Sequence, residues 1–376
     1  MTRWLCEHLR ARGRAPTVAY YATFGCDSDL IVPSWRLATG QRPGRREGQC
    51  FDGIPAVAVG CWLPELEFTY YRPSRRWSDL IAAHDRHIAV GGTPLVSYPL
   101  VAAGVPHLTW CASDSVGDRT DRVRAMSWPR RLIDRAIIMP RLQSMERRIL
   151  AGHGAIYGVS RYTATALTSD ESRVGHLPVP IATDFLVPPE RVPRPGLVGF
   201  AGRLADPRKN IVALVQAVAR ARESGIDCRA VLVGGEPDPA TRAMAGRLGL
   251  ADLIRFPGEV DRTRLREFYR DLDVFVIPSH QEGLCIAGVE AMACGVPVVS
   301  TRCGGPEDFV RPDQTGFLVD PTPDAIAAGI VRIVGDRSLR ARLSANARAL
   351  VERDYSPAAF HGRIGAAWKA VWNEDL

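Results

Sequence analysis

Two carboxylates eight positions apart give the strongest chemical signal in the sequence. Glu282 and Glu290 lie in the segment SHQEGLCIAGVEAMACGVPVV (279–299), where a strand-like apolar run is followed by a turn and a helix-like run. Eight helical residues rise about 12 Å, so these two carboxylates cannot share one proton. They are better suited to binding different parts of one extended ligand.

The residues between the two carboxylates predict an anion site. The turn at Glu282 is expected to lead directly into a helix. The first N–H groups of a helix have no partner within it, and the helix dipole is positive at that end. The N–H groups of Gly283, Leu284, Cys285 and Ile286 are therefore suited to binding a phosphate group.

A second charged cluster lies in FAGRLADPRKN (200–210), where another strand-like run leads into a helix. Arg203 and Lys209 are six positions apart there, and Lys209 is one of only two lysines in the chain, the other being Lys369. A guanidinium grips two oxygens and an ammonium acts as a point charge, which suits a diphosphate. A cation is unfavourable at a helix N-terminus unless an anion lies nearby, which favours a ligand-binding role for Lys209.

The elements that position these residues alternate along the whole chain. Short β-rich apolar runs followed by helix-period segments predict strand–helix units and parallel sheets, whose ligands bind at the carboxyl ends of the strands. The expected strands are 17–22, 56–61, 87–92, 107–111 and 155–160 in the first half and 197–203, 229–235, 254–258, 274–279 and 297–302 in the second. The expected helices of the second half are 209–223, one within 239–249, 262–271, 284–293, near 324–335, near 338–352 and 357–372.

This alternation predicts an α/β protein made of two Rossmann-like doubly wound domains facing across a cleft. The segment 176–196 holds six prolines, which break both helix and ladder, and is interpreted as the hinge. The expected domains are therefore 1–190 and 191–355. A last helix within 356–376 is expected to pack back towards the first domain.

Composition excludes several classes of protein. The 376 residues are 46% apolar and 24% charged, as in a folded soluble protein, and no apolar run reaches the length of a membrane span. Nine scattered cysteines without a CxxC pair argue against a disulfide framework or a zinc cluster, and the N-terminus has no apolar signal core. We therefore expect a cytoplasmic protein. Its net charge of +7 comes with no nucleic-acid reading module, so no nucleic-acid partner is expected.

One basic segment leaves two interpretations open. PRRLIDRAIIMPRLQSMERRIL (129–150) has the period of an amphipathic helix whose arginines lie mostly off its apolar face. A solvated helix surface is one interpretation. Docking to an anionic lipid or acceptor, with peripheral contact at the inner face of a membrane, is the other.

Taken together, the motifs of the second half resemble the retaining nucleotide-sugar glycosyltransferases of the two-Rossmann-domain (GT-B) type, glycosyltransferase family 4, also called glycosyl transferases group 1. The resemblance covers about 197–320 and follows the family's order of motifs. These motifs are GR followed by K, VLVGGEP (231–237), FPGEV (256–260), EGLCIAGVE, AMACGVPVVS (291–300), CGGPEDFV (303–310) and TGFLV (315–319). The first half matches mainly in layout. The resemblance implies that 1–190 is the acceptor side and that 191–355 binds the nucleotide sugar.

The resemblance implies a role for each candidate residue. Arg203 and Lys209 would hold the diphosphate of a UDP- or GDP-sugar, helped by the backbone of 283–286. Glu290 would accept hydrogen bonds from the ribose hydroxyls, Glu282 would contact the transferred sugar, and Gly258 to Val260 would flank the base. The family transfers sugar with retention, and the favoured route is front-face departure of the diphosphate. Two cations and a helix dipole could neutralise that leaving group without a metal, so no cofactor and no metal are expected; DLD (271–273) is expected to run into a buried strand.

The chain departs from the family's pattern at three places. Where many members carry a histidine after the strand at 107–111, this sequence reads Ala112-Ser113-Asp114; Asp114 could take the polar role or could cap the next turn. His107 falls too early and is interpreted as a structural histidine. The first loop has one glycine, Gly25, where relatives often have two, and we expect it beside the diphosphate. Cys285 is interpreted as a buried, inert thiol.

Several functions are compatible with these residues. The leading hypothesis is transfer of a sugar to a small polar natural-product intermediate, and an envelope glycolipid or polysaccharide is the alternative acceptor. A non-catalytic glycosyltransferase-like subunit would explain the missing histidine. A sugar-nucleotide epimerase or an enzyme that splits sugar–phosphate bonds stays possible on this fold, whereas the lack of G-x-G-x-x-G at the first turn disfavours a dinucleotide-dependent oxidoreductase.

Overall fold

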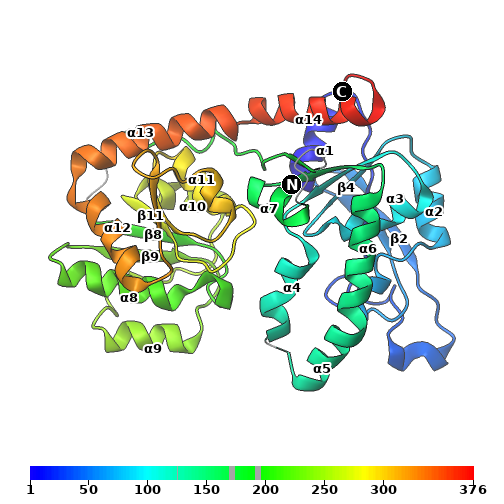
Figure 1. Cartoon of the computed structure of the whole chain (residues 1–376), viewed down its shortest axis with the longest axis horizontal. Helices are drawn as coiled ribbons and strands as arrows, with labels where there is room; N and C mark the ends of the chain where they lie inside the picture. The colour runs from blue at the N-terminus through cyan, green and yellow to red at the C-terminus, as the bar shows by residue number, and fades with distance from the viewer. Residues whose placement is uncertain (125, 169–173, 191–195) are drawn as a thin grey trace. The chain divides into compact units, whose positions relative to one another are not determined.

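The structure is a computed structural model that describes residues 1–124, 126–168, 174–190 and 196–376, without the side chains of 118, 120–122 and 124. These residues form two compact units, each with helices around parallel strands (Figure 1). Unit 1 comprises Met1–Val159, Ala164–Leu177 and His361–Leu376. Unit 2 comprises Ser160–Thr163 and Pro178–Phe360.

Unit 2 is built on one parallel six-stranded sheet with the order β10-β9-β8-β11-β12-β13. The strands are β8 (Leu197–Ala201), β9 (Arg229–Val233), β10 (Ile254–Arg255), β11 (Val274–Ile277), β12 (Val298–Thr301) and β13 (Gly316–Val319). The chain runs outward from β8 to β10 and then returns to β11 on the other side of β8. The strand order therefore switches between β8 and β11, which is where open α/β sheets place their ligands.

The helices of unit 2 follow the strands closely. They are α8 (Ile211–Glu223), α9 (Pro239–Arg247), α10 (Arg262–Arg270), α11 (Ile286–Ala293), α12 (Pro323–Gly335) and α13 (Arg337–Asp354). The sequence predicted all six, with ends shifted by a few residues. It did not predict β13, whose four residues GFLV follow the loop after β12 and were recognised only as a family motif.

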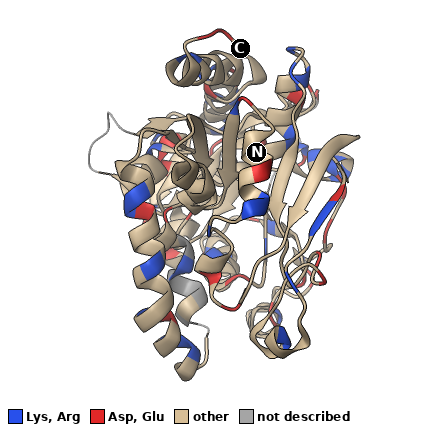
Figure 2. Ribbon diagram, turned by 90° about the vertical axis from the view of Figure 1, so that its right-hand side faces the viewer, with Lys and Arg blue, Asp and Glu red and all other residues tan. Residues whose placement is uncertain are grey.

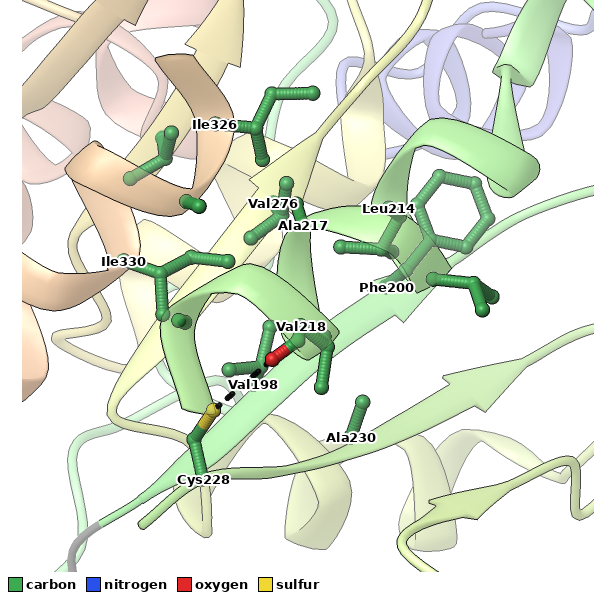
Figure 3. Close-up of a cluster of buried hydrophobic side chains, with 14 of the residues drawn as sticks. Val198, Phe200, Leu214, Ala217, Val218, Cys228, Ala230, Val276, Ile326 and Ile330 are labelled. Carbon is green, nitrogen blue, oxygen red and sulfur yellow. Dashed lines mark hydrogen bonds between the residues drawn. The ribbon is translucent and has the colours of Figure 1, made fainter. Parts of the chain in front are cut away.

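The core of unit 2 explains why this pattern of apolar residues forms a layered fold. Val198 and Phe200 of β8, Leu214 and Val218 of α8 and Ile330 of α12 are each at most 2% exposed and gather on one face of the sheet (Figure 3). Apolar burial contributes about 25 cal/mol per Å², so the burial of this cluster stabilises the unit.

Unit 1 contains two smaller sheets. One has the order β1-β3-β2 and the other has the order β4-β5-β6-β7. The strands are β1 (Val18–Tyr21), β2 (Arg45–Cys50), β3 (Ile54–Val59), β4 (His87–Gly91), β5 (His107–Cys111), β6 (Ala155–Gly158) and β7 (Val174–His176). The five predicted strands are present, but β2 and β7 were missed. β2 reads RREGQC, pairs antiparallel with β3 and is mostly exposed, so it has no apolar alternation to detect.

The helices of unit 1 include the basic segment predicted as one amphipathic helix. The helices are α1 (Thr2–Arg10), α2 (Arg75–Ala82), α3 (Tyr98–Ala103), α4 (Ser115–Arg124), α5 (Trp128–Ile133), α6 (Met139–Ala151) and α7 (Arg161–Leu167), which begins in unit 2. Between α5 and α6 the chain forms a π-helical turn, η4 (Asp134–Ile138). Pro140 lacks the N–H that would bond to the carbonyl of Ala136, and the turn widens just before it. The prediction of a single regular helix over 129–150 is therefore wrong at 134–138, where the helix is interrupted by the π-helical turn.

The proline-rich segment passes into unit 2 at Pro178. Its backbone is bound by the end of that unit: Ile181 N–H donates to the carbonyl of Tyr355 at 2.8 Å, and the Arg348 guanidinium donates to the carbonyls of Thr183 and Leu186 at 2.9 and 2.6 Å. Residues 191–195, at the predicted domain boundary, lie outside the described residues.

The last helix, α14 (Pro357–Trp372), passes into unit 1 at His361. There the rings of His361 and His8 of α1 lie 4.4 Å apart, and the Arg14 guanidinium lies 5.4 Å from the Trp368 ring. No helix in the described parts of the chain has both the length and the apolar content that a bilayer crossing requires.

A buried ion pair lies where the two central strands of the unit 2 sheet, β8 and β11, begin. Asp273, 2% exposed at the start of β11, lies 2.8 Å from the Arg340 guanidinium of α13 and accepts hydrogen bonds from the N–H groups of Gly196 and Leu197. The DLD sequence thus serves the fold: Asp273 holds the start of β8 against β11.

We predict that Asp273→Ala lowers the free energy of unfolding by about 3–5 kcal/mol, because it leaves the Arg340 charge uncompensated. Asp271→Ala, two positions away and exposed, is the matched control and should change it by less than about 0.5 kcal/mol. Denaturant unfolding of both variants checks this. Equal losses in the two variants would refute the structural role of Asp273.

Candidate functional site

The two charged clusters predicted from sequence meet at the switch point of the unit 2 sheet. Lys209 follows β8 and Glu282 follows β11, and the lysine Nζ lies 2.6 Å from Glu282 Oε1. The two side chains are only 16% and 9% exposed. Ser279 Oγ donates to the same carboxylate oxygen at 2.7 Å. The site therefore contains a largely buried ion pair between these two residues.

The loop after β8 places Lys209 differently from the prediction. Lys209 ends a 3-10 turn, η5 (Pro207–Lys209), and α8 starts only at Ile211. Asp206 caps this turn by accepting from the Arg208 N–H at 3.1 Å. Asn210 has a left-handed φ of 50°, which separates the turn from the helix. The predicted helix 209–223 was therefore two residues too long at its start, and Lys209 is held by the turn.

Arg203 lies apart from the buried pair. Its side chain is 73% exposed, and its guanidinium lies 3.1 Å from Asp206. The loops after β8 and β11 are tied together by the backbone instead, since His280 N–H donates to the carbonyl of Arg208 at 2.8 Å. Thus the structure brings Lys209 and Glu282 together, whereas Arg203 is within the same loop but reaches solvent.

The segment between the two carboxylates begins as a loop held by backbone hydrogen bonds, and the helix starts later than predicted. Glu282 N–H donates to the carbonyl of Cys303 at 2.8 Å, and Gly305 N–H donates to the carbonyl of Glu282 at 2.9 Å. A side chain at Gly305 would meet the carbonyl oxygen of Gly283 at 2.3 Å, so only glycine permits this approach. On the other side, Ser160 Oγ donates to that same carbonyl at 2.5 Å.

The helix itself, α11, begins at Ile286 and not at Leu284 as predicted. Cys285 precedes it with a left-handed φ of 66°, and its side chain makes no capping bond. In the described part of the chain nothing accepts a hydrogen bond from the N–H groups of 283–286. Most of these donors belong to the loop, and their binding of an anion stays a prediction. Burial raises the pKa of the Cys285 thiol well above its usual value, which keeps it protonated.

Glu290 has a different environment from Glu282. Its Oε2 accepts a hydrogen bond at 2.9 Å from the hydroxyl of Tyr269, a fully buried residue of α10. Burial raises the pKa of Glu290, while the Tyr269 hydroxyl and the charge of Arg262 act in the opposite direction. Sequence reasoning found both carboxylates but missed Tyr269 and Ser279, since a lone tyrosine in a basic helix and a serine at a strand end carry no distinctive signal.

The residues predicted to flank a base follow the edge strand β10, at the carboxyl end of the same sheet. Gly258 follows β10 with a φ of 78°, and its carbonyl accepts from Gly234 N–H at 3.0 Å. A side chain at Gly234 would meet the carbonyl oxygen of Gly202 at 1.8 Å, so this glycine lets the loops after β8 and β9 touch. Val260 is half-buried just beyond. Space near Gly258 is open, since a Cβ there would meet no atom within 4 Å.

Unit 2 is similar to a known protein family. Residues 187–350, less than half of the chain, match the family described as glycosyl transferases group 1. This part of the chain therefore resembles group 1 glycosyltransferases. The narrower assignment to glycosyltransferase family 4 stays a prediction.

Curated relatives are similar to this chain over stretches of up to 233 residues, longer than the segment 187–350. A D-inositol 3-phosphate glycosyltransferase of Xylanimonas cellulosilytica is 33% identical over 233 residues, 55% of each chain. A GDP-mannose-dependent alpha-mannosyltransferase of Mycolicibacterium smegmatis is 38% identical over 183 residues, 47% of this chain and 41% of the other. The chain thus spans about half the length of the curated relatives it matches.

Both units share their fold with solved glycosyltransferases. Sucrose-phosphate synthase from Thermosynechococcus elongatus superposes with a TM-score of 0.73 at 21% identity, covering 99% of this chain and 92% of that one. Anabaena HepE in complex with UDP and glucose gives a TM-score of 0.70 at 17% identity, covering 98% and 96%. The predicted α/β fold of the GT-B class is therefore confirmed.

Three residues of unit 1 were singled out from sequence, Gly25 and Asp114 in loops and His107 at the start of β5, and all lie outside residues 187–350. Asp114 caps α4, with Oδ2 accepting from the N–H groups of Val116 and Gly117 at 3.1 and 3.0 Å. This is the capping role that the sequence left open, and no described residue donates a hydrogen bond to its Oδ1. Gly25 sits in an exposed tight turn after β1. His107 is buried and bonds to the carbonyl of Val105 at 2.8 Å, so it is a structural residue.

The pairing of Glu290 with Tyr269 predicts a pH-dependent stability. A carboxyl whose pKa is raised in the folded state stabilises the fold fully below its unfolded pKa, and this contribution is lost as the pH rises through the raised value. Tyr269→Phe removes a hydrogen bond to the charged form and raises that pKa further. We expect a loss of about 1–3 kcal/mol at pH 8 and a smaller loss at pH 4.

Denaturant unfolding at the two pH values checks this prediction. The control is the same substitution in a Glu290→Gln background, where the loss should be the same at both pH values. A loss in the single variant that does not change with pH would contradict the assigned pair.

Proposed function

We propose that this chain is a retaining glycosyltransferase that transfers a sugar from a nucleotide-diphosphate sugar to a hydroxyl-bearing acceptor without a metal ion. The observation that carries the proposal is the Lys209–Glu282 pair at the switch point, beside the unpaired N–H groups of 283–286. An ammonium and unpaired N–H donors at the carboxyl ends of the strands form a site that attracts the negative charge of a diphosphate.

The ion pair suggests how a donor would be accepted. A diphosphate brings more negative charge than one carboxylate, so Lys209 can exchange Glu282 for a phosphate oxygen. Glu282 would then be released to accept hydrogen bonds from the hydroxyls of the sugar, while Ser279 keeps its carboxylate in place. Arg203, exposed in the same loop, can swing onto the outer phosphate oxygens.

The chemical step follows from this placement of charge. The bond between the anomeric carbon and the diphosphate oxygen breaks, the acceptor oxygen bonds to that carbon on the same face, and the leaving phosphate oxygen takes the acceptor's proton. Lys209 and the N–H groups of 283–286 stabilise the negative charge on the leaving group. Glu290, held by Tyr269, accepts from the ribose, and Gly258 and Val260 flank the base.

The relatives support a nucleotide-sugar donor and leave its base open. One is named for dependence on GDP-mannose, and HepE was solved with UDP and glucose. We propose a UDP- or GDP-sugar as the donor and a small polar natural-product intermediate as the acceptor.

We predict that one of UDP, GDP and ADP binds in the presence of EDTA, and that Lys209→Ala weakens this binding by about 1.5–3 kcal/mol, or roughly 10- to 150-fold, since it removes a hydrogen bond to a charged group. Calorimetric titration measures both. Lys369→Ala removes the chain's other lysine, 61% exposed on α14, and is the matched control. NMR of the anomeric product tests retention.

Two results would count against this proposal. Binding that requires a divalent ion would refute the metal-independent mechanism. The absence of binding by any of the three nucleotides would favour a non-catalytic glycosyltransferase-like subunit.

A second acceptor class, an envelope glycolipid or polysaccharide, is favoured by one surface of unit 1. Along α5 and η4 the side chains of Trp128, Leu132, Ile133 and Ile137 are 71%, 60%, 40% and 39% exposed. Figure 2 shows Lys and Arg interspersed with Asp and Glu over the face of unit 1 turned to the viewer, and Arg131 and Arg135 lie within the same helical stretch. Exposed apolar residues beside arginines are typical of helices that lie on anionic membranes.

If this surface docks to a membrane, the chain should sediment with vesicles containing anionic lipid, and Leu132→Ser combined with Trp128→Ser should reduce the bound fraction at least about tenfold. Leu248→Ser, a substitution of an equally apolar residue that is 39% exposed on unit 2, is the control and should leave sedimentation unchanged. Wild-type protein that stays in the supernatant would support the soluble acceptor.

A further inference from the structure

A buried serine holds the loop that follows Glu282. Ser160 and Thr163, both of unit 2, are 0% and 1% exposed. Ser160 Oγ donates to the carbonyl of Gly283 at 2.5 Å and accepts from the Thr163 N–H at 3.0 Å, while the Thr163 hydroxyl donates to the same carbonyl at 3.4 Å. Capping the first turn of α7 needs only the acceptor function of Ser160. The donation to Gly283 is therefore a separate interaction with a separate consequence.

Residues 160–163 are fixed to unit 2 at two further points. The Arg161 N–H donates to Asp308 Oδ2 at 2.7 Å. The Tyr162 ring packs on Gly304, where a Cβ would lie 2.7 Å from the ring. The serine that begins this segment therefore has a set position, and its hydroxyl restrains the loop rather than following it.

The held carbonyl decides where the next N–H group points. The Gly283 oxygen lies against Gly305 and is bound by Ser160. No peptide bond in the described residues is cis, and in a trans peptide the C=O and the N–H point in opposite directions. The Leu284 N–H therefore points away from both neighbours, and no described residue accepts a hydrogen bond from it.

Without the serine hydroxyl this peptide plane could turn. Gly283 has no Cβ and so tolerates more backbone conformations than other residues. A turned plane would present the carbonyl oxygen, an acceptor with partial negative charge, where the N–H now lies. An anion bound there would then meet repulsion in place of a hydrogen bond.

We propose that Ser160 is a positioning residue of the donor site, which directs the Leu284 N–H to the diphosphate without touching the donor. This role rests on the proposed function, since it needs a diphosphate bound at 283–286. Its effect is confined to the phosphates. The nucleoside part of the donor, assigned to Glu290 and Gly258, does not depend on it.

The first test compares each nucleoside diphosphate with its nucleoside. The full-length chain, as wild type and as Ser160→Ala, is titrated with UDP, GDP, uridine and guanosine, using competition where binding is weak. We expect Ser160→Ala to weaken binding of the preferred diphosphate by about tenfold, because a charge-assisted hydrogen bond is lost, and to leave binding of the matching nucleoside unchanged. Ser160→Gly is a second variant, since glycine is tolerated at a helix N-cap.

Thr322→Ala is the matched control. Thr322 caps α12 in the same unit by accepting from the Ala325 N–H at 3.3 Å, and no hydrogen bond in the described structure joins it to the loop 282–286. This variant loses a helix cap but keeps the site, so it should bind every ligand like wild type. An equal loss in Thr322→Ala, or an equal loss for nucleoside and diphosphate in Ser160→Ala, would reduce Ser160 to a structural role and overturn the proposal.

The Leu284 amide gives a direct readout. In protein labelled with isotope-enriched leucine, its NMR signal is assigned by its loss in Leu284→Met. Adding the preferred diphosphate should shift this signal downfield in the wild type, as a new hydrogen bond forms, and less so in Ser160→Ala. A shift of equal size in both proteins would contradict the proposal.

The same titrations separate this proposal from the proposed function. Wild-type protein that binds neither UDP nor GDP would refute the donor site and, with it, this role of Ser160. If the wild type binds one of them and both Ser160 variants bind it equally tightly, only the positioning role is refuted.

Discussion

The ion pair between Lys209 and Glu282 is the interaction on which the organisation of unit 2 depends. The two residues lie 73 positions apart in sequence, and they meet because β8 and β11 are neighbours across the switch point of the sheet. Removing either partner would leave a largely buried charge uncompensated, which is costly. The loops on both sides are fixed accordingly: Asp206 caps the turn that ends at Lys209, and Ser279 holds the carboxylate. Under the proposed function, a phosphate that displaces the carboxylate would take its place beside the Lys209 ammonium.

The carboxylates of Glu282 and Glu290 are chemically identical but have different surroundings. Glu282 has a cation as its main partner, whereas Glu290 has a neutral phenol and a raised pKa. Burial favours the protonated, uncharged form of Glu290, whereas the Tyr269 hydroxyl and the charge of Arg262 favour its carboxylate form. Two glutamates eight positions apart therefore lie in different electrostatic surroundings.

Most of the fold and the chemical types of the site could be predicted from sequence because the signals are local. Apolar runs mark β8, β9 and β11, and the scarcity of lysine singles out Lys209. What could not be predicted depends on tertiary contact or on unusual backbone. The strand β2 is exposed and hydrophilic, the Tyr269–Glu290 bond joins two helices, and the left-handed Cys285, which delays α11, has no sequence signal at a non-glycine residue. The direct pairing of Lys209 with Glu282 was missed for the same reason, since each was assigned only to a ligand.

The two units differ in how their buried cations are paired. In unit 2, Lys209 has one carboxylate partner, and the N–H groups of 283–286 have no partner in the described structure. In unit 1, Arg119 is held between the carboxylates of Glu67 and Asp134. A cation with one carboxylate partner exchanges that partner for an incoming anion more easily than a cation held by two, which is why the proposed function places the diphosphate in unit 2. Under that proposal the acceptor hydroxyl loses its proton during transfer, and the oxygen that becomes most basic at that moment is the one on the departing diphosphate.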